Sequence, residues 1–277
     1  MTTFSTNTLI NLNDITSDYT YLNEDENELA FAHVREHIAN VRNRPNQSQW
    51  NDAWDDVGKC NAPKYFKPRF TIDGQGVYRY NQKFIKSPYP NLESKFHDEL
   101  LKIVQERWLS DADCVVEFGC GTGHNLQKIR HRDSFIKVYG SDWANSSQEI
   151  LQNHNIPSWN FDMKTCEGEL PKEIFDCDNI CFLTVGSMEQ IGKEWENFLA
   201  FMLDFKPKRS IHIEPTIELY DKENQVASLA IEYHLKRYYL NGFFNKIHNM
   251  DQLKFYERTS FGNTYNEGFT VMELEYE

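Results

Sequence analysis

Short apolar runs separated by segments with helical spacing characterise the chain after residue 92. Runs that predict buried strands lie at 115–118, 135–142, 156–163, 175–185 and 210–215. Between and after them, segments such as 195–205 and 224–243 repeat their apolar residues at the helical period. Two alternating segments, 253–260 and 268–276, predict a closing hairpin with a long loop. Strands that alternate with helices predict an α/β fold, with a doubly wound, seven-stranded mixed sheet.

The first ninety-one residues follow a different pattern. Helical spacing predicts helices at 25–42 and 49–57, and a further helix at 92–109 should pack on the sheet just before its first strand. Residues 1–24 are polar with weak periodicity, which predicts an extended arm. We therefore predict two units, an N-terminal, mostly helical cap or lid at 1–91 and a core at 92–277.

Residues 60–90 contain several prolines and predict an irregular connection. Its aromatic part at 77–85 is a candidate lid over the sheet, with Tyr78, Arg79 and Tyr80 as substrate-binding residues. The alternative is a packed connection whose aromatic side chains fill a core. The sequence leaves both interpretations open.

The junction between the first strand and its helix carries the clearest chemistry. It reads Glu117-Phe118-Gly119-Cys120-Gly121-Thr122-Gly123, with glycines at alternate positions. Glycine can adopt positive φ and lets a ligand lie against the backbone. A dinucleotide fingerprint would need its third glycine where His124 stands, and a phosphate loop would need a lysine in the turn. The carboxylate of Glu117 would repel a pyrophosphate and suits a ligand with a positive amino group.

This E-x-G-x-G-x-G pattern after a buried strand resembles the first motif of class I S-adenosylmethionine (SAM)-dependent methyltransferases, and the resemblance covers residues 92–277. It implies a Rossmann-like methyltransferase core in which Glu117 and the turn hold the methionine part of SAM. Asp142 ends the second strand, roughly 25 residues after Glu117, where a carboxylate can accept from both hydroxyls of a ribose. Trp143 could stack on the purine, and the family often places an acid for the adenine amino group at the position of Asp162.

We accordingly expect SAM as cofactor. The predicted cofactor-binding residues are Glu117, Gly119, Cys120, Gly121, Gly123, His124, Asn125, Asp142, Trp143, Asp162, Met163 and Thr184. The turn alone could simply connect a strand to a helix, but acidic residues at the ends of three predicted strands argue for a cofactor crevice.

Candidate catalytic and substrate-binding residues lie in segments that follow the later strands. Ligands of open α/β sheets bind outside the carboxyl ends of the strands, where the loop after 175–185 and the end of 210–215 should meet. On the helix at 224–243, positions 234, 237 and 238 should share one face. The candidates for removing a proton from the acceptor are Glu189, Glu214 and His234, and the candidates for substrate binding are Ser187, Gln190, Arg237 and Tyr238. Glu189 could instead be a first-turn carboxylate that interacts favourably with the helix dipole. Residues 234, 237 and 238 could instead form salt bridges or core contacts.

Composition restricts the class of substrate. The chain has 277 residues and a formal net charge of −13, whereas a protein that grips a phosphate backbone needs a basic stripe. Lys64, Lys67 and Arg69 form a small basic cluster that we interpret as a solvated loop. No apolar run could cross a bilayer, and the N-terminus lacks the features of a secretory signal. We expect a cytoplasmic protein that binds neither nucleic acid nor membrane.

The six cysteines form no C-x-x-C pair, which predicts reduced core cysteines rather than a zinc site or disulfides. Asp176 and Asp178 are close in sequence but should lie at a strand start, the wrong edge of the sheet, so we predict no metal. The function expected is methyl transfer from SAM to an oxygen or nitrogen of a small polar metabolite or of a sugar or polysaccharide precursor. The alternatives are a protein-modifying methyltransferase and a non-catalytic partner on a methyltransferase scaffold, and a homodimer is left open.

Overall fold

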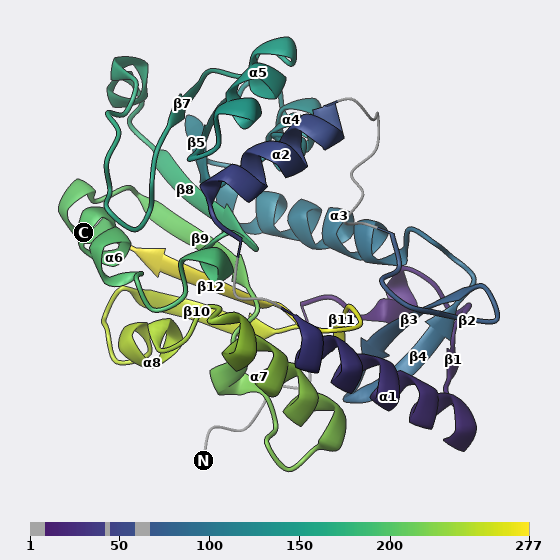
Figure 1. The fold of residues 1–277 in the computed structure, drawn as a ribbon. Helices are drawn as coiled ribbons and strands as arrows, with labels where there is room; N and C mark the ends of the chain where they lie inside the picture. Colours follow the sequence, from purple (N-terminus) through teal and green to yellow (C-terminus); the bar gives the residue numbers. More distant parts are fainter. Residues whose placement is uncertain (1–8, 42–44, 59–66, 277) are drawn as a thin grey trace.

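The computed structural model describes residues 9–41, 45–58 and 67–276, and its largest element is a seven-stranded mixed sheet (Figure 1). In spatial order its strands are β10 (Leu253–Arg258), β12 (Thr270–Glu275), β9 (Arg209–Glu214), β8 (Ile180–Val185), β5 (Cys114–Phe118), β6 (Lys137–Asp142) and β7 (Ser158–Asn160). The pairs among β5 to β9 are parallel, and β12 runs antiparallel to both β9 and β10. The predicted doubly wound mixed sheet is therefore confirmed.

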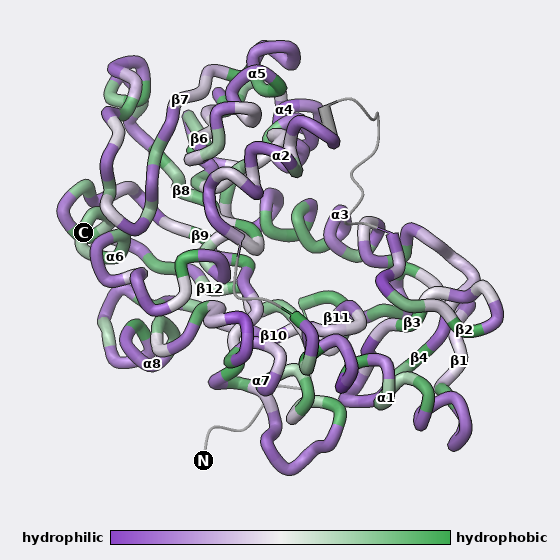
Figure 2. Tube along the Cα trace, in the orientation of Figure 1, coloured by the Kyte–Doolittle hydropathy of each residue, from purple (hydrophilic) through white to green (hydrophobic). Residues whose placement is uncertain are grey.

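Helices cover both faces of this sheet. They are α3 (Leu92–Val104), α4 (His124–Arg132), α5 (Asn145–Asn153), α6 (Glu196–Phe205) and α8 (Phe243–Ile247), whereas α7 (Gln225–Arg237) packs against α1. Val115 packs in one apolar cluster with side chains of α3, α4 and α5, while its neighbour Val116 packs in another with side chains of α6 and α8. Because both faces of β5 are buried, its sequence is a continuous apolar run rather than an alternating one. Figure 2 shows hydrophobic stretches along the central strands and mainly hydrophilic residues on the peripheral helix α1 (Glu24–Asn40).

A second, smaller sheet lies beside the first and is entirely antiparallel. Its strands are β1 (Thr20–Tyr21), β4 (Lys83–Ser87), β3 (Gln75–Tyr80) and β11 (Phe261–Gly262), with β2 (Thr71–Ile72) also paired to β3. Strand β11 belongs to the loop of the β10–β12 hairpin, so the predicted cap and the predicted core share this sheet. The boundary between residues 91 and 92 stays a prediction, although α3 begins there.

The prediction of an irregular segment at 77–85 is wrong, because β3 and β4 form a tight hairpin there. Asn81 and Gln82 connect the strands with φ of 49° and 61°, the left-handed conformation of a two-residue hairpin turn. Val77 to Tyr80 are all buried, so the strand shows no alternation of polar and apolar residues by which it could be recognised.

Other differences concern the ends of elements. Of the predicted extended arm, residues 1–8 lie outside the described residues, whereas 9–23 are folded and Leu12 is completely buried. The strand predicted at 175–185 begins only at Ile180, after a 3-10 helix at Lys172–Asp176. The helix predicted at 92–109 changes to a π-helical turn at Gln105–Leu109. The helix predicted at 224–243 ends at Arg237, because Tyr238 adopts a left-handed conformation with φ of 55°.

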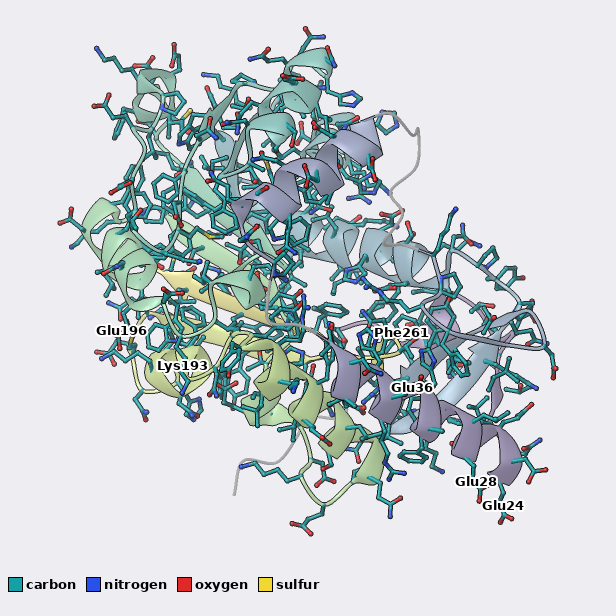
Figure 3. The ribbon with its side chains drawn as sticks, viewed as in Figure 1. Glu24, Glu28, Glu36, Lys193, Glu196 and Phe261 are labelled. Carbon is teal, nitrogen blue, oxygen red and sulfur yellow. The ribbon has the colours of Figure 1, made fainter. Side chains whose placement is uncertain are left out.

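Two helices from the N-terminal part lie over the core. Helix α1 packs beside α7, and Glu24 and Glu28 at its outer end point away from the protein (Figures 1 and 3). Helix α2 (Gln47–Gly58) lies on α5. The carboxamide oxygen of Asn51 accepts a hydrogen bond from the backbone N–H of Asn145 at 2.7 Å. Helix α5 is therefore capped by a residue of α2, because its own N-cap residue is an alanine.

Replacing Asn51 with alanine should destabilise the protein by about 1 kcal/mol, the usual cost of losing a helix cap. Urea unfolding followed by circular dichroism measures this free energy. Asp55→Ala, an exposed position on the same helix, is the control and should change it by less than about 0.5 kcal/mol. Equal unfolding free energies for the two variants would show that α2 does not cap α5 in solution.

None of the described helices has the length and apolar character required to cross a membrane. Cys114, Cys120, Cys166, Cys177 and Cys181 are free thiols. Cys60 and Lys64 lie outside the described residues.

Candidate functional site

A cavity of about 540 Å³ opens at the carboxyl ends of β5, β6 and β8. This volume lies in the range of small-molecule sites. Its walls come from the core and also from α1, α2 and the loop between β10 and β12. The sheet edge chosen from the sequence is thus the one that carries the cavity.

The floor of the cavity is the glycine turn after β5. Gly119, Gly121 and Gly123 have φ of 69°, 54° and 69°, a region that strains other residues. A Cβ on Gly119 would lie 2.4 Å from the Cβ of Ser187, and one on Gly121 would lie 2.7 Å from Cζ2 of Trp54. Glycine is therefore required here both by the backbone and by the close approach of neighbouring elements.

Glu117 lies one residue before the end of β5, beside this turn, and is 1% exposed. Its Oε1 accepts a hydrogen bond from Nδ2 of Asn125 at 2.6 Å. Its Oε2 is buried and has no hydrogen-bond partner among the described residues. Burial raises the pKa of Glu117 to about 8. A cationic group placed here would supply the missing partner and stabilise the carboxylate.

Asp142 ends the next strand, β6, and also lines the cavity. Its Oδ2 accepts from the backbone N–H of Gly121 and its Oδ1 from that of Ala144, both at 2.9 Å. A carboxylate offers about four acceptor positions, so two remain for hydroxyl groups of a ligand. Burial raises the pKa of Asp142 to about 6.

A part of the cavity lined mainly by aromatic and thioether side chains follows Asp142. Trp143, Phe161, Asp162 and Met163 line it. The Nζ of Lys164 lies 4.9 Å from the centre of the Trp143 ring. A planar group in this part would thus lie between aromatic and thioether side chains, next to a carboxylate.

The predicted cofactor residues line this cavity with two exceptions, as far as the described residues form it. Gly123 lies behind the turn, where a Cβ would approach Cδ2 of Leu151 to 2.4 Å. Thr184 is fully buried within the sheet, with its hydroxyl 2.9 Å from Nδ1 of His212. Neither residue lines the cavity that the described residues form, so the structure does not support the prediction that they contact the cofactor.

Glu189 lies farther along the cavity, in the loop after β8. Its Oε1 accepts from Nε2 of Gln190 at 2.8 Å, while its Oε2 is buried without a partner among the described residues. Burial raises the pKa of Glu189 to about 7. Ser187, Gln190 and Arg237 also line the cavity, as the sequence predicts.

Three other predicted residues lie outside the walls that the described residues form. Glu214 is fully buried and accepts hydrogen bonds from the backbone N–H groups of Ser187, Met188 and Glu189, so it fixes the loop that carries Glu189. The Nε2 of His234 lies 2.9 Å from Oδ1 of Asn266, behind the wall of the cavity. Tyr238 is 63% exposed because the helix ends before it. The predicted catalytic roles of Glu214 and His234 and the binding role of Tyr238 are therefore not supported.

Tyr78, Arg79 and Tyr80 are buried in the second sheet and likewise do not line the cavity formed by the described residues. The Tyr78 hydroxyl donates to the carbonyl of Tyr89, and the Tyr80 hydroxyl to Oδ1 of Asn11. Of the two interpretations of this segment, the packed connection is the one that the structure contains.

Sequence analysis did not predict most of the residues that line the cavity on the side away from the glycine turn. This wall includes His37 of α1, Tyr233 of α7, Tyr239 and Tyr265, together with Arg69 and Glu93. Tyr239 is one residue from the predicted Tyr238, so locating the end of α7 correctly would have found it. Groups of three or more metal-ligating side chains with suitable placement do not occur in the described ranges.

No protein-family model and no curated protein matches the chain. Among solved structures, the [4+2]-cyclase SpnF is similar with a TM-score of 0.50 at 12% identity, over 85% of this chain and 99% of that one. The N-methyltransferase NodS from Bradyrhizobium japonicum WM9, in complex with S-adenosyl-L-homocysteine (SAH), gives 0.47 at 10% identity over 66% and 86%. The plantazolicin methyltransferase BpumL, also with SAH, gives 0.44 at 10% over 90% and 100%. At such low identities the similarity concerns the fold alone, and it agrees with the Rossmann-like arrangement of the seven-stranded mixed sheet described above.

Proposed function

We propose that the cavity binds SAM and that the protein transfers its methyl group to an oxygen or nitrogen of a small molecule. The observation that carries this proposal is the buried, unpartnered Oε2 of Glu117 beside a turn of left-handed glycines. Glu117 would hold the ammonium group of SAM, Asp142 the ribose hydroxyls, and the side chains around Trp143 the purine. Each of these groups meets a side chain of complementary chemistry.

When bound, SAM supplies an electrophilic methyl group, whose bond to sulfur breaks with the electron pair left on sulfur as the acceptor atom forms its new bond. The protein orients the acceptor in line with that methyl group and excludes water. Where the acceptor is neutral, it must also take up a proton. Glu189 is the candidate for this role, since its pKa of about 7 lets it accept a proton near neutral pH.

Replacing Glu189 with glutamine should lower kcat by about 10²-fold, the usual contribution of a positioned base. In the wild type, kcat/KM should rise with pH to a plateau above about 7 as the carboxyl group ionises. The variant should lose this rise while it binds SAM as well as the wild type. A pH profile of tritium transfer from SAM and a titration with SAH measure the two properties, and an unchanged profile would exclude Glu189 as the base.

The alternatives make different demands on the cavity. A protein substrate needs an open groove, whereas α1, α2 and the loop between β10 and β12 contribute walls to this cavity. That enclosure favours a small acceptor. The similarity to a [4+2]-cyclase shows that proteins of similar fold can catalyse different reactions, so the fold alone does not identify the reaction. A non-catalytic scaffold would have no need for a buried carboxylate in the position of Glu117.

Isothermal titration of the purified protein with SAM and with SAH tests the proposal. We expect both to bind in a 1:1 complex, and tritium from the methyl group to appear in one member of a panel of small acceptors. Absence of binding heat for both ligands at several temperatures would overturn the proposal. Binding without transfer to any acceptor would favour the scaffold interpretation.

A further inference from the structure

The far end of the cavity is built from aromatic rings. We call His37, Tyr233, Tyr239 and Tyr265 the aromatic wall; all four line the cavity. The rings of His37 and Tyr265 are stacked with centres 4.3 Å apart and planes at 20°, and those of Tyr233 and Tyr265 with centres 5.0 Å apart at 24°. The ring of Tyr239 meets that of Tyr233 edge to face at 5.8 Å. Three separate parts of the chain therefore contribute one continuous aromatic surface.

The amides beside this wall are already engaged within the protein. The Oδ1 of Asn263 accepts from the backbone N–H groups of Tyr265 and Asn266, and its Nδ2 donates to Oε1 of Glu93. The Oδ1 of Asn266 is bonded to the ring of His234. The amide oxygens of Asn263 and Asn266 thus already accept hydrogen bonds within the protein, which reduces the acceptors available to the hydroxyl groups of a sugar.

Two hydroxyl groups of the wall, those of Tyr239 and Tyr265, are also engaged. The hydroxyl of Tyr265 lies 3.2 Å from Nε2 of His33. The hydroxyl of Tyr239 accepts from Nε and Nη2 of Arg237 at 3.0 and 2.8 Å. Tyr233, Tyr239 and Tyr265 are 7%, 7% and 5% exposed, so each contributes a small aromatic area to the lining of the cavity, and this lining favours a planar acceptor over a polyol.

A positive charge lies at the same end of the cavity. Arg69 lines it, is exposed, and has no hydrogen bond or ion pair within the described ranges. Burial raises the pKa values of Glu93 and Glu189, and the nearby charge of Arg69 acts in the opposite direction on both. Burial thus holds the carboxyl group of Glu93 toward its neutral form, so Glu93 balances the charge of Arg69 only in part. In a chain with a net charge of −13, this end of the cavity is locally suited to an anion.

We propose that the methyl acceptor is a small aromatic carboxylic acid whose ring lies on the aromatic wall and whose carboxylate pairs with Arg69. A guanidinium group binds a carboxylate through two parallel hydrogen bonds, which gives direction as well as strength. The hydroxyl or amino group that receives the methyl group then lies toward Glu189. This inference rests on the proposed function and specifies the substrate class of the same site.

The test uses the full-length protein saturated with SAH and titrated calorimetrically with four probes. They are 4-hydroxybenzoate, the neutral 4-hydroxybenzamide, the cationic benzylamine and the anionic sugar glucuronate. We expect 4-hydroxybenzoate to bind at least about 10-fold more tightly than each of the others, from one charge-assisted pair and ring contact. Arg69→Gln should remove the preference for the acid over the amide, and Lys67→Gln, an exposed neighbour, should retain it.

Tyr265→Leu separates the ring contact from the charge. It should weaken 4-hydroxybenzoate and 4-hydroxybenzamide equally, and a thermal melt together with SAH binding shows whether the variant is folded. Tighter binding of benzylamine, or equal binding of glucuronate, would overturn the inference, as would binding of SAH without binding of any probe. Failure of SAH itself to bind would instead overturn the proposed function, so the two failures are distinguishable.

Discussion

Replacing Glu117 with glutamine is expected to weaken SAM binding by about 10²–10³-fold, the cost of removing one partner from a buried charge pair. The substitution keeps the shape of the side chain, and its oxygen can still accept from Nδ2 of Asn125. It removes the negative charge and places an amide donor where the ammonium group of SAM would lie. Calorimetric titration with SAM and SAH measures the loss.

Stability distinguishes this effect from misfolding. Burial raises the pKa of Glu117 from 4.5 to about 8, so between these pH values the native state holds a proton that the unfolded state releases. The contribution of Glu117 to the stability of the ligand-free wild type therefore falls as pH rises through this range. Glu117→Gln lacks that loss and should be at least as stable as the wild type at pH 7.5. Glu149→Gln, an exposed carboxyl on α5, should leave both binding and stability unchanged, and equal SAM affinity in Glu117→Gln would contradict the assigned role.

Sequence analysis located those parts of the site that depend on short, continuous stretches of sequence. In a parallel sheet the carboxyl ends of neighbouring strands meet at one edge, so Glu117, Asp142 and Asp162 could be placed together from their positions after apolar runs. The glycine turn could be located because positive φ restricts the choice of residue. Glu214 illustrates the limit of this reasoning. It ends a strand at the same edge, but its carboxylate accepts three hydrogen bonds from the backbone of the loop after β8.

The parts that sequence analysis missed depend on contacts between distant segments. Strand β11 pairs Phe261 with Tyr80 and Gly262 with Arg79, although these residues are more than 180 positions apart. No local pattern predicts such a pairing, because each segment is short and buried on both sides. The aromatic wall has the same origin, since α1, α7 and the loop between β10 and β12 bring its residues together.

Arg79 holds these distant segments together from a completely buried position. Its Nε donates to the carbonyl of Thr264 at 3.0 Å, and its Nη1 donates to the carbonyl of Val226. Its Nη1 also lies 3.6 Å from Oε2 of Glu267, which is 1% exposed. Burial lowers the pKa of Arg79 to about 10 and raises that of Glu267, so for both partners desolvation outweighs their mutual attraction. The pair is therefore costly to bury and more costly to break.

Replacing Arg79 with methionine should destabilise the protein by about 3–5 kcal/mol, because it leaves the buried carboxyl group of Glu267 with Arg258, at 4.0 Å, as its remaining ion-pair partner in the described part of the chain. Urea unfolding measures this loss, with Lys83→Met, an exposed position in the same hairpin, expected to change stability by less than about 0.5 kcal/mol. The double variant Arg79→Met/Glu267→Leu should recover more than half of the loss, since it removes the uncompensated charge along with the cation. No recovery would mean that the bonds from Arg79 to Thr264 and Val226, and not the ion pair, connect the hairpin loop to α7. Either result identifies the contact that fixes Tyr265 and Tyr233 in the wall of the cavity.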